Sequence, residues 1–328
     1  MKILWLTENV WSAMMNLNGN VSVSGPNEKI IQNKHNDYDS KEEKIMPLVT
    51  SKEMLLKAQK GGYAVGAFNA ENMEMVKAII QAAEELKAPV MIQTTPSTVK
   101  YGTVETYAAI VAAEAAKASV PVCLHLDHGS SFALAMQAMH AGYTSVMIDG
   151  SKLDFEDNIR ETRRVADVAA ALNIPCEAEL GKVGGKEDDL EAEADTNTDP
   201  QEAKEFVERT GVTSLAVAIG TAHGFYVGTP VLDKERLSEI REFVDIPLVL
   251  HGASGLSDED VRDCVKRGIC KVNFATELRA AYSRAVKETF AENENTIDPK
   301  AYGKKAIQAV KELVEARMKV CGCDGKAE

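Results

Sequence analysis

Three histidines of this chain stand at or just past the ends of short apolar runs, and this placement constrains the fold more than any other feature. The three are His128, His223 and His251, and Asp127 precedes the first of them. Short apolar runs of this kind are typical of buried parallel strands. If the strands belong to one barrel, their carboxyl ends meet on one face, where residues far apart in sequence can surround one ion. Three imidazoles with an open fourth position are typical of a catalytic zinc site.

The other histidines fit a more ordinary interpretation. His125 lies inside its predicted strand, His140 falls in a predicted helix, and His35 belongs to a polar leader. A single histidine of this kind is more often a satisfied polar residue than a ligand. We therefore expect none of these three to bind the metal.

Apolar runs alternate with stretches of helical period from residue 60 onward, which is the pattern of repeated βα units. The predicted strands cover residues 63–68, 89–94, 120–126, 145–148, 175–180, 214–219, 247–250 and 270–274. The predicted helices cover residues 72–87, 104–118, 131–140, 155–172, 201–210, 233–243, 257–267 and 277–291, with an additional C-terminal helix at 303–319. Eight alternating pairs predict an α/β fold, a (β/α)8 TIM barrel, rather than a doubly wound open sheet.

Composition narrows the functional classes. The chain has 328 residues, of which 45% are hydrophobic and 27% charged, and this suits one large α/β barrel. Its net charge of −13 argues against nucleic acid or an anionic membrane as a partner. The six cysteines are scattered and no signal peptide precedes them, so we expect reduced thiols and a cytoplasmic protein.

The first 45 residues differ from the rest. Residues 1–45 hold both tryptophans, lack sustained periodicity and end in a charged run, so we expect a disordered extension or a start-site artefact. The working domain would then be residues 46–328. Thr50 or Ser51 ahead of Glu53 predicts a capping box that opens its first helix.

Loops after the last two predicted strands suggest a phosphate site. Barrels often bind phosphate there through backbone N–H groups and a helix N-terminus. Glycine at position 224, beside a predicted ligand, would also allow close backbone approach. The candidate phosphate-binding residues are Gly224, Gly252, Ala253, Ser254, Asn273, Phe274, Ala275 and Thr276.

A metal beside a phosphate site suits the enolisation of a phosphorylated ketone, because a metal that polarises a carbonyl acidifies the adjacent C–H. Asp127 could be the separate acid/base, turned away from His128 by strand alternation. A Schiff-base lysine is the other possible chemistry, with Lys271 as its candidate. That alternative would leave the three histidines unexplained.

Five segments together resemble the class II, metal-dependent ketose-bisphosphate aldolases. The segments are His-Leu-Asp-His-Gly (125–129), Glu-Ala-Glu-Leu-Gly-Lys-Val-Gly-Gly-Lys-Glu-Asp (177–188), Gly-Thr-Ala-His-Gly (220–224), His-Gly-Ala-Ser-Gly (251–255) and Asn-Phe-Ala-Thr-Glu-Leu (273–278). The Gly-Thr-Ala-His-Gly and Ala-Thr-Glu-Leu forms, together with the Cys-Gly-Cys-Asp-Gly-Lys-Ala tail, are most similar to the tagatose-1,6-bisphosphate aldolase branch.

The resemblance implies roles for particular residues. It implies zinc on His128, His223 and His251, with Asp127 as the proton donor on the hydroxyl side of the cleaved bond. Glu187 would be the base for the dihydroxyacetone-phosphate proton. A possible second metal position corresponds to Asp149 and Glu179.

The resemblance also implies that the phosphate loops hold dihydroxyacetone phosphate, with a monovalent cation expected near them. Phe274 departs from the smaller valine expected in this branch, which would add bulk near the phosphate loop. The acidic, glycine-rich stretch 182–198 is expected to be an active-site lid rather than a structural element.

The expected activity is zinc-dependent, reversible cleavage of D-tagatose 1,6-bisphosphate to dihydroxyacetone phosphate and D-glyceraldehyde 3-phosphate. Fructose 1,6-bisphosphate is the alternative substrate, since the two ketoses differ at one hydroxyl-bearing carbon. A second alternative is a non-catalytic barrel that works as a partner subunit. We expect a homo-oligomer, a dimer or tetramer, with a companion subunit as a further possible partner.

Overall fold

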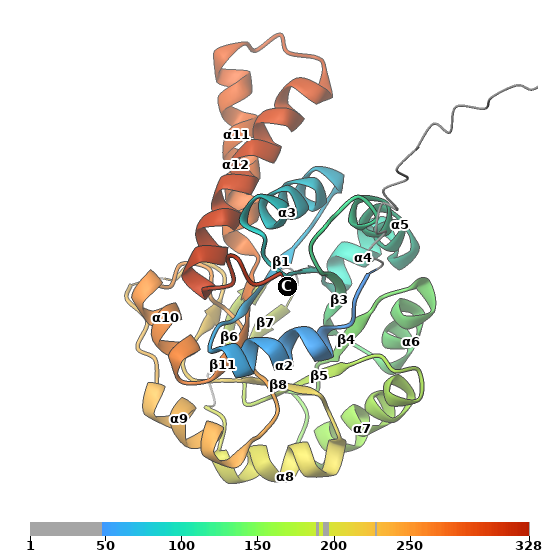
Figure 1. The fold of residues 1–328 in the computed structure, drawn as a ribbon, viewed down its shortest axis with the longest axis vertical. Helices are drawn as coiled ribbons and strands as arrows, with labels where there is room; N and C mark the ends of the chain where they lie inside the picture. Colours follow the sequence, from blue (N-terminus) through green and yellow to red (C-terminus); the bar gives the residue numbers. More distant parts are fainter. Residues whose placement is uncertain (1–47, 188–189, 193–196, 227, 328) are drawn as a thin grey trace, which may run out of the picture. The chain divides into compact units, whose positions relative to one another are not determined.

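Eight parallel strands close into a barrel in the computed structural model, which describes residues 48–187, 190–192, 197–226 and 228–327 (Figure 1). The predicted extension 1–45 lies outside the described residues. Around the barrel the strands follow the order β1-β11-β10-β8-β5-β4-β3-β2, and β1 pairs with both β2 and β11. The strands are β1 (Val65–Asn69), β2 (Val90–Thr94), β3 (Val122–Gly129), β4 (Ser145–Ile148), β5 (Cys176–Leu180), β8 (Ser214–Val217), β10 (Leu248–Leu250) and β11 (Ile269–Phe274). The predicted TIM barrel is confirmed.

Helices follow the strands and surround the barrel (Figure 1). Their apolar faces bury Val, Ile, Leu and Ala against the outer side of the sheet. The helices are α2 (Ser51–Gly61), α3 (Met73–Leu86), α4 (Pro96–Gly102), α5 (Val104–Ala115), α6 (Phe132–Ala141), α7 (Phe155–Ala171), α8 (Pro200–Thr210), α9 (Lys234–Phe243), α10 (Asp258–Lys266), α11 (Thr276–Glu292) and α12 (Pro299–Cys321). The additional C-terminal helix is longer than predicted, because Asp298 caps it and Pro299 occupies its first position.

Helix α2 covers the amino ends of the strands. The Ser51 side chain is buried and its Oγ lies 2.9 Å from Oγ of Ser145, the first residue of β4. The N-cap residue is Thr50, whose side chain makes no cap hydrogen bond. The predicted capping box is therefore wrong. The Ser51 hydroxyl contacts Ser145 of β4, and the Thr50 hydroxyl does not cap the first turn of the helix.

Strand β3 runs three residues further than predicted and carries a bulge. Its register with β4 shifts between Leu126 and Gly129. Inside that irregularity His128 has a φ of 49°, which is uncommon outside glycine. Simple alternation would turn Asp127 inward and His128 outward. Bulges re-aim side chains, and here both residues are buried.

The stretch predicted as a lid without structure contains two short strands. Strand β6 (Gly184–Glu187) pairs antiparallel with β7 (Leu190–Ala192) and parallel with β9 (Ala222–His223). Gly185 has a φ of 84°, and a Cβ there would lie 2.2 Å from the His223 carbonyl oxygen. The expectation that this stretch has no structural element is wrong for its described residues, because backbone pairing with β9 orders them.

All six cysteines are free and buried. Burial raises the pKa of the Cys123 and Cys176 thiols to about 12, so both stay protonated and unreactive near neutral pH. No helix in the described part of the chain combines the length and the apolar character needed to cross a membrane.

Candidate active site

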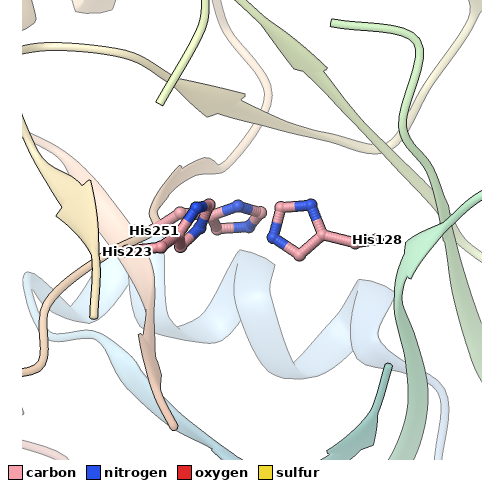
Figure 2. Close-up of side chains that lie close together, drawn as sticks. All are labelled: His128, His223 and His251. Carbon is pink, nitrogen blue, oxygen red and sulfur yellow. The ribbon is translucent and has the colours of Figure 1, made fainter. Parts of the chain in front are cut away.

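Three imidazoles converge at the carboxyl end of the barrel (Figure 2). His128 comes from β3, His223 from β9 and His251 from the residue after β10. One ring nitrogen from each lies within 4.8 Å of the others, and the His128 ring centroid is 5.0 Å from that of His223 and 4.7 Å from that of His251. Such a set could hold one metal ion, as the sequence predicted.

A carboxylate orients the first of these rings. His128 Nδ1 lies 2.9 Å from Asp149 Oδ2, and Asp149 Oδ1 accepts hydrogen bonds from the Ser151 N–H and hydroxyl at 3.0 and 2.7 Å. Burial alone would raise the pKa of Asp149, but the contacts with His128 and Ser151 lower it further than burial raises it. Asp149 was predicted at a possible second metal position, and the structure places it beside Nδ1 of His128.

His251 lies between two glutamates of β5. Its Nε2 is 3.0 Å from Glu177 Oε1, and its Nδ1 is 2.9 Å from Glu179 Oε2. Burial lowers the pKa of His251, yet the contacts with Glu177 and Glu179 outweigh it and raise the pKa to about 9. Glu179 was predicted at a possible second metal position, and the structure places it beside Nδ1 of His251.

Asp127 is fully buried among three amide side chains. Its Oδ2 accepts hydrogen bonds from Asn69 Nδ2 at 3.0 Å and Gln93 Nε2 at 3.2 Å, and its Oδ1 accepts one from Asn273 Nδ2 at 3.0 Å. Burial raises the pKa of Asp127, while the positive charges of His128 and Lys271 lower it more. The carboxylate form of Asp127 is thus the stable one.

A buried ion pair lies beneath the histidines. Lys271 Nζ is 3.0 Å from both carboxylate oxygens of Glu177, and neither side chain is more than 1% exposed. His125 Nδ1 is 2.8 Å from Ser145 Oγ, and burial lowers the pKa of His125 to about 3. His125 is thus a neutral core residue, and Lys271 is not a free amine.

The predicted phosphate loops lie side by side. Ser254 Oγ accepts a hydrogen bond from the Ala275 N–H at 3.3 Å, at the N-terminus of α11. Gly252 has a φ of 67°, and a Cβ there would lie 2.6 Å from the Ala222 carbonyl oxygen. The Tyr226 hydroxyl joins the same two loops, since it accepts from the Ala222 N–H at 2.9 Å and donates to the Gly252 carbonyl at 2.6 Å.

Phe274 does not add bulk to the phosphate site. Its side chain is fully buried, stacks on Phe68 with centroids 5.5 Å apart, and lies 5.7 Å beneath the Arg317 guanidinium of α12. Asn273 bonds Asp127 inside the barrel, so alternation turns the next residue outward. The expected effect of this ring on the phosphate site is therefore wrong, and only the backbone of Phe274 remains near the loop.

Gly224 and Glu187 are two further residues that the sequence predicted at the site. Gly224 follows His223 with a φ of 93°, a conformation that suits glycine. Glu187 ends β6, while its side chain and Asp188 lie outside what the structure describes.

Sequence reasoning missed several polar residues that build the site. Asn69, Gln93 and Glu177 lie on strands whose burial is complete, and Lys271 was considered only as a nucleophile. Their signal was the presence of polar residues within otherwise apolar strands. A buried polar group needs a partner, so such residues point to one another inside the barrel.

A closed parallel barrel with three converging imidazoles at its carboxyl end defines a metal-dependent TIM-barrel enzyme. The family model for class II fructose-bisphosphate aldolases matches residues 49–326, and this chain belongs to that family. It is accordingly a metal-dependent aldolase, a carbon–carbon lyase.

Solved structures agree with this assignment. The YdjI aldolase from Escherichia coli K12 is 40% identical, with a TM-score of 0.76 over 86% of this chain and 100% of that one. A protein of Coccidioides immitis solved as a candidate fructose-1,6-bisphosphate aldolase is 32% identical, with a TM-score of 0.77 over 84% and 96%. Fructose-bisphosphate aldolase from Campylobacter jejuni, at 22% identity and a TM-score of 0.74 over 85% and 97%, shares the fold.

Metal uptake by the metal-free protein should release protons. The pKa of His251 is about 9 without metal, and the carboxylates of Asp127 and Asp149 raise that of His128 above its usual value despite the opposing effect of burial. A metal binds only the neutral rings. Calorimetric zinc titrations in buffers of different ionisation enthalpy should give release of about one to two protons at pH 7, falling as the pH approaches 9. Equal heats in all buffers would contradict the assignment of these rings as ligands.

Proposed function

We propose that this aldolase reversibly cleaves D-tagatose 1,6-bisphosphate to dihydroxyacetone phosphate and D-glyceraldehyde 3-phosphate at a zinc centre on His128, His223 and His251. The observation that carries the chemistry is the convergence of three ring nitrogens within 4.8 Å, beside a buried carboxylate. The sugar preference rests on the Gly-Thr-Ala-His-Gly and Ala-Thr-Glu-Leu segments and on the C-terminal tail, all similar to the tagatose branch.

The donor set fits zinc. Three imidazoles are ligands that zinc prefers, and carboxylates on the opposite ring nitrogens are the usual way to orient such ligands. Asp149 supports His128 in this way, and Glu177 supports His251. A zinc ion there would polarise the ketone carbonyl and acidify its neighbouring carbon.

Asp127 would handle the proton of the cleaved bond. In cleavage its carboxylate accepts the proton of the C4 hydroxyl while the C3–C4 bond breaks, the C4 oxygen becomes the aldehyde carbonyl, and the electron pair stays on the dihydroxyacetone-phosphate half. In condensation Asp127 returns that proton to the aldehyde oxygen. Asn69, Gln93 and Asn273 hold the carboxylate in place through both directions.

Glu187 would move the second proton, at C3 of the dihydroxyacetone-phosphate half. It ends β6, the strand that pairs with His223, so loop and metal ligand share one small sheet. Glu179 and Asp149 would offer the second metal position. Of the two, Glu179 is the stronger candidate, because its Oε2 lies 2.9 Å from Nδ1 of His251.

The backbone N–H groups of Gly224, of Gly252 to Ser254 and of Asn273 to Thr276 would hold the phosphate, at the amino end of α11. A monovalent cation near these loops would offset the phosphate charge. We further propose a cytoplasmic homo-oligomer, a dimer or tetramer, with or without a companion subunit. Retention of the complete ligand set supports a catalytic rather than a purely supporting subunit.

The substrate is tested by comparing kcat/KM on the two ketose bisphosphates. We expect the tagatose compound to be cleaved with at least about tenfold higher kcat/KM, because an inverted hydroxyl leaves a buried polar group without its partner. Faster cleavage of fructose 1,6-bisphosphate would transfer the proposal to that sugar and leave the zinc chemistry intact.

Substituting Asp127→Asn should lower kcat by about 10²–10⁴, since a positioned acid/base is lost while side-chain volume is kept. Zinc content measured by atomic absorption should stay near one per chain. The matched variant Asp149→Asn should instead weaken zinc binding first, because it removes the carboxylate that orients His128. Near-normal turnover in the Asp127 variant would remove this residue from the mechanism.

Substituting Glu187→Gln should slow exchange of the dihydroxyacetone-phosphate C–H with solvent, because an amide cannot take up that proton. Deuterium exchange followed by NMR measures the effect, with Glu191→Gln on the paired strand as the control. Zinc content should be unchanged in both. Exchange at the parent rate in the Glu187 variant would assign the base elsewhere.

A further inference from the structure

We propose that the buried Glu177–Lys271 ion pair positions His251 by fixing which of its ring nitrogens meets the metal. Neither residue belongs to the proposed ligand set. Both are positioning residues, and they act on the centre through His251. This inference rests on the zinc centre proposed above.

His251 contacts two carboxylates, but only its contact with Glu177 is a hydrogen bond: Nδ1 and Glu179 Oε2 lie 2.9 Å apart, and neither atom has a hydrogen-bond partner among the described residues. Glu177 Oε1 lies 3.0 Å from His251 Nε2, and a carboxylate without a proton can only accept in that contact. The hydrogen of the neutral ring is therefore on Nε2. Nδ1, which has no hydrogen-bond partner in the described part of the chain, then carries the lone pair that a metal ligand needs.

Lys271 holds the carboxylate in that orientation. Its Nζ lies 3.0 Å from Glu177 Oε1 and 3.0 Å from Oε2, so both oxygens are held by one ammonium group. The exposed fractions are 0% for Lys271 and 1% for Glu177, and burial of a carboxylate without a partner would be costly. Lys271 thus stabilises the ionised carboxylate of Glu177, which accepts the hydrogen bond from His251.

The same contacts argue against a nucleophilic role for the lysine. A Schiff base needs an amine with a lone pair and room for a carbonyl carbon. Lys271 Nζ donates to both carboxylate oxygens and has no exposed surface. Its chemistry inside the barrel is that of a counter-ion.

The test is the zinc affinity of folded variants, measured by competition with a chelating indicator at one pH. Glu177→Gln keeps the volume but loses the charge, and we expect zinc binding about 10–100-fold weaker. Lys271→Met should weaken zinc binding in the same direction. The double variant leaves no unpaired charge, so it should fold where a single variant does not, and its zinc affinity should still be at least about tenfold weaker.

Arg317→Met provides the control for lost stability. Arg317 makes a two-point ion pair with Glu277 at 2.8 and 2.7 Å, between α12 and α11. Breaking that pair should lower the urea concentration at the midpoint of unfolding, while the zinc affinity stays within about twofold of the parent value. The absorption bands of the cobalt-loaded protein should shift in Glu177→Gln and not in Arg317→Met, because only the former changes how His251 is held.

Zinc affinity within twofold of the parent in the folded double variant would overturn the inference, leaving the pair a purely structural one. Normal zinc binding with lost cleavage in Lys271→Met would also overturn it, by assigning the lysine to the chemistry. Failure of the parent protein itself to bind zinc would instead overturn the proposed centre.

Discussion

Charge balance inside the closed barrel is the constraint on which the site depends. Asp127, Glu177, Glu179 and Lys271 are at most 2% exposed, so water cannot compensate them and each must find its partner within the protein. Three carboxylates against one ammonium leave an excess of negative charge. That excess raises the pKa of His251 in the metal-free chain, and it favours a divalent cation at the same place.

Backbone geometry brings the three histidines close to these charged groups. At the register shift in β3, His128 has a positive φ, and it is buried together with the preceding Asp127. Gly252 and Gly185 leave room for the β9 segment, because a Cβ at either position would strike backbone atoms of Ala222 or His223. The barrel brings the three histidines to one end of the sheet. The β3 bulge and the two glycines then allow the segments that carry His128 and His223 to lie close together.

The barrel fold is shared by proteins of widely different sequence. The likeness to the Campylobacter jejuni structure at 22% identity shows that the barrel persists while most side chains change. Two sugars that differ in the orientation of one hydroxyl can share the same zinc centre, the same acid/base and the same phosphate loops. Discrimination then depends on a few polar groups near one carbon, which is why family membership leaves the sugar open.

The sequence by itself determined the barrel, since eight apolar runs alternate with amphipathic stretches, and it located the three histidines and Asp127 at strand ends. It did not show which partners Asn69, Gln93, Glu177 and Lys271 have, because these partners lie on other strands that come together only when the barrel closes. It also misjudged Thr50, Phe274 and the stretch 182–198. Each of these three outcomes depends on contacts between segments that are distant in sequence. Hydrophobic periodicity reports only the conformation that a segment favours by itself, so it could not predict them.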